Sequence, residues 1–489
     1  MTRCRIVPAL LLAVLAAGCQ DFLDVNDNPN APEHARVDLR LPALIAAFGH
    51  SVYYGDTQLW SAEWVQQFSY NRETRNYSEV HRYELQENDA SHAWNFYFSQ
   101  VMNEARLIMA ETDPETDGPY HGLAKFFWAW TWAHVTDMWG PVPFEQAFDT
   151  SIPDPEYDDQ QLVYAAVHEW FEEAIADMQR PSLHLPGAND LLFEGDMTRW
   201  VKLARVVQAR HHLRLAYAPG EDPAGRAQQA LNALQQGFTS NADDADFIYL
   251  GGEGGARNPH WTFQDLDQFR ASEFMVQLLQ ARDDPRLPIM VRPAQYDSVR
   301  GDIVYRGHKN GAASEVDSTM SQVGHFFSNE DAPLNWASYA DAKFLEAEAR
   351  LIVGGAAAAD APYREAIRAN MEKWGVAAGE IDAYLAARPS LTQVANPLEE
   401  IMTQKYIANY LKVDPWNDWR RTGYPLLEIV EDAVLPGIPQ RIRTPGSELS
   451  NNSENVRETG IDIGLDGMVA KVWWALQGPP ASLTGGAGN

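Results

Sequence analysis

The sequence has very little cysteine and comparatively little positive charge. Only Cys4 and Cys19 occur, and one cysteine remains if residues 1–18 are removed. One cysteine excludes an intramolecular disulfide and a site built from several cysteine ligands in the mature chain. Lys and Arg total 38 against 68 Asp and Glu, which gives a formal net charge of −30. A body this acidic argues against nucleic-acid binding, because phosphates need clustered cations, and against docking on anionic lipid.

Long hydrophobic runs are also absent after Cys19, so no later segment is expected to span a bilayer as a helix. At the N-terminus, Arg3 and Arg5 precede an uncharged apolar stretch, residues 6–17, and small residues lead up to Cys19. This order is typical of a bacterial lipoprotein signal peptide. We therefore expect residues 1–18 to be removed and Cys19 to carry diacylglycerol and acyl lipid. An ordinary export signal with an incidental cysteine is the alternative.

Composition divides the rest of the chain into three parts. Residues 19–32 are polar and rich in turn formers, as expected of a lipidated cysteine followed by a flexible tether. Residues 33–477 carry repeated helical patterns and are predicted to form a single helical body. Residues 478–489 are poor in large apolar side chains and are predicted to be a flexible tail.

The body is predicted to be mainly α-helical and arranged as antiparallel helix pairs. Apolar residues recur at helical spacing, and Gly or Pro ends several of the runs. Asn396, followed by Pro397 and Glu399, is typical of a helix start. Some spacing resembles tetratricopeptide pairs, although generic helix packing explains it equally well. The predicted helices cover residues 93–110, 123–138, 163–178, 200–217, 225–236, 339–352, 360–374 and 397–412.

Residues 238–332 depart from this pattern and are predicted to be a loop-rich insertion. The stretch is rich in Gly, Pro, Asn and Asp, with a short strand-like piece at residues 303–305. Loops this long in a compact protein are usually functional or disordered. The aromatic residues inside this one favour a function.

The sequence shows no pattern that positively indicates a catalytic or a metal-binding site. Neighbouring acids are numerous, but nothing separates one pair from another, so solvated faces and helix caps explain them best. His211 and His212 are adjacent on a helix and point about 100° apart, which prevents them from sharing a metal. Residues 462–467 are too short for an EF-hand loop and make only a weak calcium candidate. We expect no catalytic residues and no metal.

Aromatic residues are the better indication of function. Trp64, Tyr70 and Tyr77 lie in a segment that also carries Asn71 and Arg72. Flat rings beside amide and guanidinium groups suit a sugar site, because rings stack on C–H faces while polar groups bind hydroxyls. A buried helical stripe is the alternative for Trp60, Trp64 and Phe68, which are spaced by four, whereas Tyr70 to Tyr83 are expected in an exposed loop.

Two further tryptophans are candidate ligand contacts. Trp261, together with Phe263, and Trp336 fall in segments predicted to be loops. Loops on a rigid scaffold frequently carry binding residues. The candidate ligand-binding set is therefore Trp64, Tyr70, Asn71, Arg72, Tyr77, Trp261 and Trp336.

Short motifs occur in a defined order along nearly the whole chain, beginning directly after Cys19. They are residues 21–26 (DFLDVN), 28–30 (NPN), 137–143 (DMWGPVP), 284–287 (DPRL), 339–349 (YADAKFLEAEA), 404–406 (QKY), 417–425 (NDWRRTGYP) and 471–474 (KVWW). In this order and number they resemble the SusD/RagB-like nutrient-binding outer-membrane lipoproteins, in particular the SusD-like 2 subgroup. They look like scaffold signatures, so they do not transfer a binding site.

The resemblance implies a mainly α SusD-like fold, with tetratricopeptide-like helix pairs, few short strands and a loop-rich ligand face. It also implies a SusC-like TonB-dependent outer-membrane transporter as partner, over which the lipoprotein sits as a lid. Ligands of the family include glycans and, in some members, peptides. They are captured outside the cell and released into the barrel without a covalent step.

The sequence and the resemblance together predict a surface-exposed, lipid-anchored binding subunit of a nutrient importer, with an oligosaccharide as the expected ligand. It is predicted not to be an enzyme and to carry no cofactor besides the lipid on Cys19. A peptide-binding subunit is one alternative. A lipid-anchored glycoside hydrolase, using acids within 154–159 or 243–246, is a second, and a helical scaffold without a small ligand is a third.

Overall fold

The structure is a computed structural model that describes residues 36–71, 79–252, 257–265 and 269–484. The predicted signal peptide, Cys19 as the predicted lipidation site, the predicted tether and the last five residues lie outside the described residues. So do two candidate ligand contacts, Arg72 and Tyr77.

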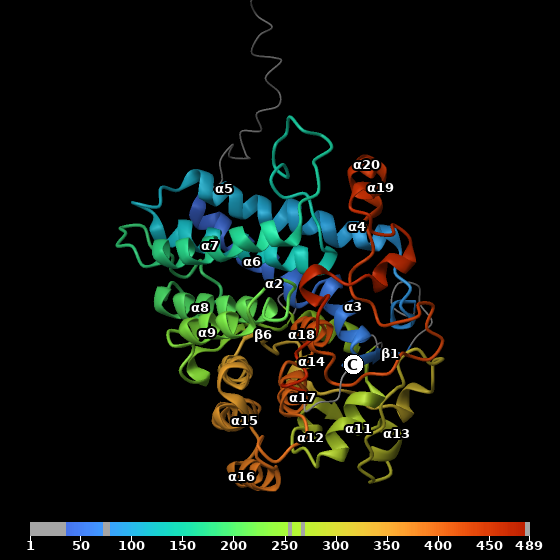
Figure 1. Ribbon diagram of the computed structural model, residues 1–489. Helices are drawn as coiled ribbons and strands as arrows, with labels where there is room; N and C mark the ends of the chain where they lie inside the picture. The colour runs from blue at the N-terminus through green and yellow to red at the C-terminus, as the bar shows by residue number, and fades with distance from the viewer. Residues whose placement is uncertain (1–35, 72–78, 253–256, 266–268, 485–489) are drawn as a thin grey trace, which may run out of the picture.

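Helices dominate the fold, as predicted, and the first group forms one layer of the body (Figure 1). The long helix α6 is buried almost all round, because aromatic and small apolar residues occupy every face of it. It packs against α7 on one side and against α2 and α5 on the other. The layer comprises α2 (Val37–Tyr53), α3 (Asp56–Trp64), α4 (Glu87–Phe96), the π-helix η2 (Tyr97–Met102), α5 (Asn103–Glu111), α6 (Gly118–Trp139) and α7 (Gln160–Met178).

The remaining long helices form pairs of the predicted kind. In α15, Gly355 has a φ of 74°, so residues 339–354 and 356–373 are two helices that meet at a sharp turn. Phe344 from the first and Tyr363 from the second share one apolar core. The tetratricopeptide-like pairing expected here is therefore present. These helices are α8 (Met197–Arg214), α9 (Pro223–Leu234), α15 (Tyr339–Lys373), α16 (Ala378–Ala387), α17 (Pro397–Ala408) and α18 (Asp414–Thr422).

Helix α17 starts as predicted and ends earlier than predicted. Asn396 Oδ1 accepts a hydrogen bond from the Glu399 backbone N–H at 3.1 Å, which is the expected cap. The helix stops at Ala408 instead of continuing to Lys412, because the chain turns at Leu411, whose φ is 60°. That left-handed conformation is unfavourable for a residue with a Cβ.

The insertion contains short, separate elements that connect distant parts of the chain. Three two-stranded antiparallel sheets pair β1 with β3, β2 with β6 and β4 with β5. The short strand predicted at residues 303–305 is not formed there. The strands are β1 (Phe68–Tyr70), β2 (Ala245–Phe247), β3 (Phe269–Ala271), β4 (Val291–Arg292), β5 (Gln322–Val323) and β6 (Leu334–Ala337). The helices between them are α10 (Pro259–Asp265), α11 (Glu273–Ala281), α12 (Leu287–Met290), α13 (Gln295–Ser298) and α14 (His325–Ser328).

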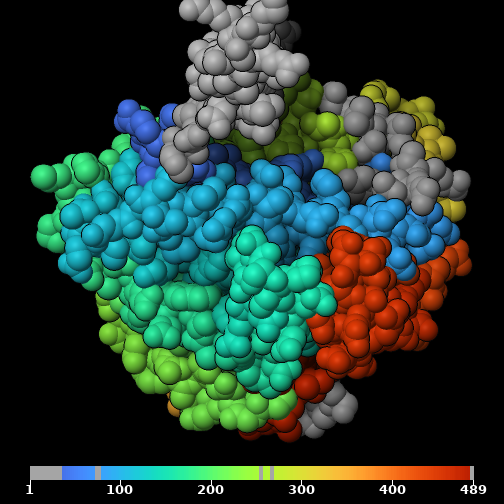
Figure 2. Space-filling view, turned by 90° about the horizontal axis from the view of Figure 1, so that it is seen from above, coloured from blue at the N-terminus to red at the C-terminus, as the bar shows by residue number. Residues whose placement is uncertain are grey.

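The C-terminal segment returns to the first helical layer. It carries α19 (Gly446–Asn451) and α20 (Ser453–Glu458), which lie beside the loop after α6 (Figure 2). In that contact Asn452 Nδ2 donates to the Pro155 carbonyl at 2.8 Å. The 3₁₀ helices of the chain are η1 (Val80–Arg82), η3 (Asn241–Asp243), η4 (Asp317–Thr319), η5 (Leu465–Val469) and η6 (Trp473–Ala475).

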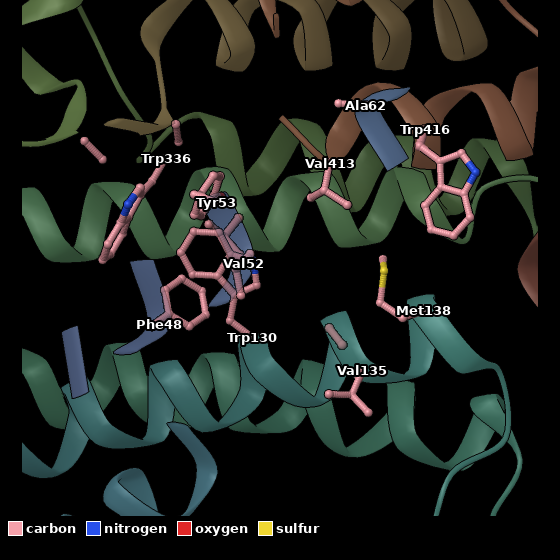
Figure 3. Packing of buried hydrophobic residues seen from close by; sticks show 14 of the residues in the cluster. Phe48, Val52, Tyr53, Ala62, Trp130, Val135, Met138, Trp336, Val413 and Trp416 are labelled. Atoms are coloured by element: carbon pink, nitrogen blue, oxygen red, sulfur yellow. The ribbon is translucent and has the colours of Figure 1, made fainter. Parts of the chain in front are cut away.

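The main core lies where the first layer meets the insertion (Figure 3). Trp336 of β6 lies nearly parallel to Tyr53 of α2, with ring centroids 5.8 Å apart, and meets Phe48 edge-on at 5.3 Å. Burying rings of this size contributes a large hydrophobic area. Within the described ranges, no helix combines the length and the apolar character needed to cross a membrane.

Candidate functional site

Two of the predicted ligand contacts are core residues. Trp64 and Trp336 are 0% exposed, so neither ring presents a face to a ligand. Trp64 Nε1 donates to the Val80 carbonyl at 3.1 Å, which makes the buried-stripe alternative the right one for this residue. Trp336 lies in strand β6 and not in a loop. The prediction that it is loop-borne was therefore wrong.

The remaining predicted contacts that the structure describes are also mostly enclosed. Tyr70 is 2% exposed in β1, and Tyr83 is fully buried, so these two rings are not exposed as expected, while residues 72–78 between them lie outside the described residues. Asn71 Nδ2 donates to Asp317 Oδ1 at 2.6 Å and to the Glu315 carbonyl at 3.0 Å, which ties two loops together. Trp261 lies in helix α10 instead of a loop; it is partly exposed and stacks under the Arg257 guanidinium at 4.4 Å.

A different set of aromatic residues lines a groove that is open to solvent. We call it the aromatic groove and define it by the side chains that offer rings or polar atoms to it. The set is His50 and Tyr54 from the end of α2, Asp56 from α3, His92 and Phe96 from α4, and Phe263 from α10.

The turn between α2 and α3 positions one wall of the groove. A Cβ at Gly55 would lie 2.6 Å from the Ser51 carbonyl oxygen, so only glycine allows this tight approach. The turn brings Tyr54 and Asp56 to the same edge. His50 lies one helical turn before Tyr54, and the two ring centroids are 5.5 Å apart.

The rings form a continuous series across the groove. The centroid of His50 is 5.4 Å from that of Phe96, and Tyr54 is 6.0 Å from Phe263. Phe263 in turn stacks on Phe269, with planes 3° apart, which fixes its orientation. Partly buried rings held by neighbouring rings form a rigid platform of the kind that stacks on a flat ligand.

Polar groups accompany the rings at the rim. His92 Nδ1 lies 3.0 Å from Asp56 Oδ2, so the carboxylate holds the imidazole in place. Burial lowers the pKa of His50, and the nearby Asp56 only partly offsets this effect. His50 is therefore neutral at pH 7 and offers one donor and one acceptor. The neutral imidazole of His50 and the carboxylate of Asp56 can both hydrogen-bond to hydroxyl groups, whereas they do not supply a charge that would attract an anionic ligand.

The backbone under the groove is irregular at this point. Residues 97–102 form a π-helix between α4 and α5, and Tyr97 at its start closes the groove floor. Tyr97 Oη donates to the Ser51 carbonyl at 2.8 Å and lies 2.9 Å from His134 Nε2. π-Helical turns occur frequently at functional sites. The irregularity lets Phe96 face the groove while Tyr97 stays inside.

The acidic segments considered for catalysis have structural roles. Asp158 Oδ2 accepts hydrogen bonds from the backbone of Phe144 and Glu145 at 3.1 and 2.9 Å. Asp243 pairs with Lys202 at 2.8 Å, and Asp244 pairs with Lys373 at 2.6 Å. These carboxylates hold loops and helix ends, and no arrangement of an acid with a nucleophile emerges from them.

The weak calcium candidate is a turn in which a side-chain oxygen already accepts a backbone hydrogen bond. Asp462 Oδ1 accepts the Gly464 N–H at 2.7 Å, inside the segment considered for calcium. In the parts of the chain that the structure describes, no group of three or more His, Cys, Asp or Glu side chains is placed to hold a metal ion.

Sequence reasoning missed the groove apart from Phe263. The available signal was two pairs of residues at i, i+4 spacing, His50 with Tyr54 and His92 with Phe96. Such pairs lie on one face of a helix, but packing against a core explains them as readily as binding does. Only the three-dimensional structure shows that both pairs line the same groove.

Comparisons with known proteins agree on the fold. A family model described as "Starch-binding associating with outer membrane", of the SusD-like type, matches residues 36–445. A SusD/RagB family protein from Bacteroides thetaiotaomicron has a TM-score of 0.77 at 22% identity, covering 91% of this chain and 99% of that one. A chitin-binding protein has a TM-score of 0.74 at 25% identity, covering 89% and 100% of the two chains.

A chitin-binding SusD homologue from Flavobacterium johnsoniae has a TM-score of 0.76 at 21% identity, covering 89% of this chain and 98% of that one. A search among curated proteins gives no match. The family match extends over most of the chain and includes the helices and the insertion that form the aromatic groove. The chain therefore belongs to the SusD-like family of nutrient-binding proteins associated with the outer membrane.

Proposed function

We propose that this protein is the lipid-anchored, surface-exposed binding subunit of a nutrient importer and that it captures an oligosaccharide in the aromatic groove. The observation that carries the proposal is the series of rings from His50 to Phe263, with Asp56 and His92 beside it. Sugar rings stack on aromatic faces, while neutral imidazole and carboxylate groups bind hydroxyls. The captured ligand passes to a SusC-like TonB-dependent barrel without a covalent step.

The chitin-binding relatives suggest the first ligands to test. Chitin binding is a property of those proteins, and at 21–25% identity it serves here as a guide to the choice of sugars. The groove itself carries paired or neutral groups, which favours a neutral glycan over a highly charged one. Chitooligosaccharides and maltooligosaccharides are therefore the primary probes, with a panel of short peptides as the alternative.

Truncating one groove ring is expected to weaken oligosaccharide binding. In Phe96→Ala the sugar loses a stacking face, so the dissociation constant should rise about tenfold, equivalent to about 1.4 kcal/mol. Isothermal titration calorimetry on residues 20–489 measures this directly. The matched control is Tyr296→Ala on α13, which removes an aromatic side chain that is 46% exposed and lies outside the groove.

One result would count against the glycan as ligand, and another against the aromatic groove as its site. Tight peptide binding with no response to any sugar favours the peptide-binding alternative. Equal affinity of Phe96→Ala and the unchanged protein places the sugar site elsewhere. Turnover of a chromogenic glycan would favour the glycoside-hydrolase alternative. The turnover rates of Asp158→Asn and Asp244→Asn would then show whether either acid takes part.

The proposed anchor has a separate test. Cys19→Ser removes the lipid attachment point and leaves the body untouched, so the affinity of the purified body should stay unchanged. Uptake of the ligand by cells should fall strongly, because the binding subunit is no longer held at the membrane. Cell fractionation and uptake of labelled oligosaccharide measure the two effects. Lost affinity in solution, or normal uptake, contradicts the role assigned to Cys19.

A further inference from the structure

A second pocket lies between the insertion and the helix pairs. We call it the Lys412 pocket. It is bordered by β6, α14, α15 and the turn that follows α17, and α10 borders both it and the aromatic groove. Its lining includes His260, Phe327, Asn335, Trp374, Tyr410 and Lys412.

Aromatic rings form one wall of this pocket. Phe327 meets Trp374 edge-on, with centroids 5.2 Å apart and planes at 90°, and meets Tyr410 at 5.1 Å and 79°. Phe326 packs against the same indole at 5.9 Å. Mutual edge-to-face packing fixes these rings, so the wall is a rigid apolar corner that offers ring faces and ring edges to a ligand.

Three buried polar atoms in the pocket lack partners among the residues that the structure describes. They are Nδ1 and Nε2 of His260, which is 2% exposed, and Oη of Tyr410, which is 3% exposed. Buried polar groups are nearly always hydrogen-bonded, so these three atoms are available to a molecule that enters the pocket. Burial lowers the pKa of His260 to about 4, so the ring is neutral and offers one donor and one acceptor.

The pocket is lined by two lysines, and Lys412 is the one whose hydrogen bonds go to neutral amide oxygens. Its Nζ donates to Asn335 Oδ1 at 2.6 Å and to Asn409 Oδ1 at 3.2 Å, which leaves a third N–H. Lys373, in contrast, bonds to the carboxylates of Asp244 and Asp246. Lys412 is the donor that an incoming anion can reach with the greatest electrostatic gain.

The backbone holds this lysine in place under strain. Leu411 has a φ of 60°, and its N–H donates to Gln67 Oε1 at 2.8 Å while its carbonyl accepts from Gln58 Nε2 at 2.9 Å. Two buried glutamines from the first helical layer thus fix the turn that carries Tyr410 and Lys412. Strained residues held by their surroundings occur preferentially at ligand sites.

We propose that the Lys412 pocket binds a six-membered ring that bears a carboxylate. The ring lies against Trp374 and Phe327, the carboxylate accepts from Lys412, and Tyr410 and His260 bond to the remaining polar groups. A sugar acid and an aromatic acid share this chemistry. This second site is separate from the glycan groove, and its existence does not depend on what the groove binds.

The acid–base state of Lys412 gives the site a distinctive pH dependence. Burial lowers the pKa of Lys412 to about 8, against the opposing effect of nearby carboxylates. The lysine is charged at pH 7 and loses its proton as the pH rises above 8, so affinity for a carboxylate should fall at high pH. The charged groups that act on it are Asp341, Asp414, Arg210 and Lys373. Asp246 also lines the pocket, where it accepts a hydrogen bond from Asn335 at 2.7 Å and pairs with Lys373.

Calorimetry on residues 20–489 tests the proposal with D-glucuronate, D-galacturonate and benzoate, and with D-glucose, D-galactose and benzyl alcohol as neutral counterparts. At pH 7 at least one carboxylate should bind at least tenfold more tightly than its neutral counterpart. Tighter binding of a hexuronate identifies a sugar acid, and tighter binding of benzoate identifies an aromatic acid. The affinity should decrease between pH 8 and pH 10.

Two variants in the pocket and one control define the site. Lys412→Met should weaken carboxylate binding at least tenfold and abolish the pH dependence, whereas Lys343→Met on α15 should change neither. Tyr410→Phe keeps the shape of the pocket and should weaken binding several-fold, which keeps the test valid if Lys412→Met fails to fold. Phe96→Ala in the groove should leave carboxylate affinity unchanged.

Three results would overturn the proposal. They are no binding of any of the three carboxylates at 20 mM, equal affinity for every carboxylate and its neutral counterpart, and unchanged carboxylate affinity in a folded Lys412→Met. Each of them is independent of the outcome for oligosaccharides, since the groove variants test that site separately.

Discussion

Acidification from pH 7 to pH 5 is expected to destabilise this protein strongly. Six histidines are less than 9% exposed, and burial lowers the pKa of each. The pKa of His134 falls to about 3, and those of His81 and His212 fall to about 4. In the unfolded chain all of them titrate near 6.5. The full set is His81, His134, His211, His212, His260 and His308.

The sign of the effect follows from the protons bound in each state. Below pH 6.5 the unfolded chain takes up protons on these histidines while the folded protein keeps them neutral, so stability falls as the pH falls. Each proton that the unfolded chain binds and the folded protein does not lowers the free energy of unfolding by about 1.4 kcal/mol per pH unit of acidification. Glu63, Asp137 and Asp244 act in the opposite direction, because burial raises their pKa values and the folded state binds their protons. Three such carboxyls offset only part of the effect of six imidazoles.

Thermal unfolding followed between pH 7.5 and pH 4.5 measures this prediction. A net loss of several kcal/mol per pH unit is comparable to the whole stability of a typical protein, about 5–15 kcal/mol. The midpoint should therefore fall by about 10 °C or more between pH 7 and pH 5.

His134→Gln is the matched variant, because a glutamine can replace the hydrogen bond between Nε2 of His134 and Oη of Tyr97 without titrating. The midpoint of this variant should fall less steeply with pH. A midpoint that stays constant from pH 7.5 to pH 5 would show that the imidazoles are protonated in the folded state.

The helical frame could be predicted from the sequence because its causes are local. Apolar spacing identified α6 to α9 to within a few residues at most ends, and Asn396 with Pro397 marked the start of α17. The two glycines at 354 and 355 correctly separated two helices of one pair. Caps, breakers and periodicity act over a few residues, so each can be recognised without the rest of the chain.

The ligand-binding residues could not be predicted in the same way. Trp336 was expected to be accessible because it falls in a segment predicted to be a loop. In the structure β6 pairs with β2, whose residues lie about ninety positions earlier in the chain, and the ring is buried. Composition cannot distinguish a ring that stacks on sugar from one that fills a core. The groove joins Tyr54, Phe96 and Phe263, which are brought together only by tertiary packing.

Removing Glu348 is expected to cost about 3–5 kcal/mol of stability, because it leaves Arg421 charged and partly unpaired in the core. Glu348 lies on α15 and is 0% exposed, and Arg421 lies on α18 and is 2% exposed. The guanidinium forms a bidentate pair with the carboxylate, in which Nη2 is 2.7 Å from Oε2. Asp418 also accepts from Arg421 at 2.7 Å and is the partner that remains.

A control on the same helix separates burial from charge. Glu346 pairs with Arg350 and with Lys343, each at 2.7 Å and one turn or less away, and the side chains of these two cations are 45% and 26% exposed. Solvent screens such a pair, so Glu346→Ala should cost about 1 kcal/mol or less. Chemical unfolding of both variants at pH 7 gives the comparison. A similar loss for Glu346→Ala and Glu348→Ala would mean that water reaches the buried pair.

The double variant shows whether the pair stabilises the fold or only avoids an uncompensated charge. If most of the loss in Glu348→Ala comes from the stranded cation, Glu348→Ala combined with Arg421→Ala should lose less than the sum of the two single variants. The expected coupling is about 2–3 kcal/mol, since each single change removes the partner of a desolvated charge. Additive losses would instead assign the cost to cavities left by the truncated side chains. A large coupling implies that Glu348 and Arg421 fix how α15 sits against α18, and α15 and the turn before α18 both line the Lys412 pocket.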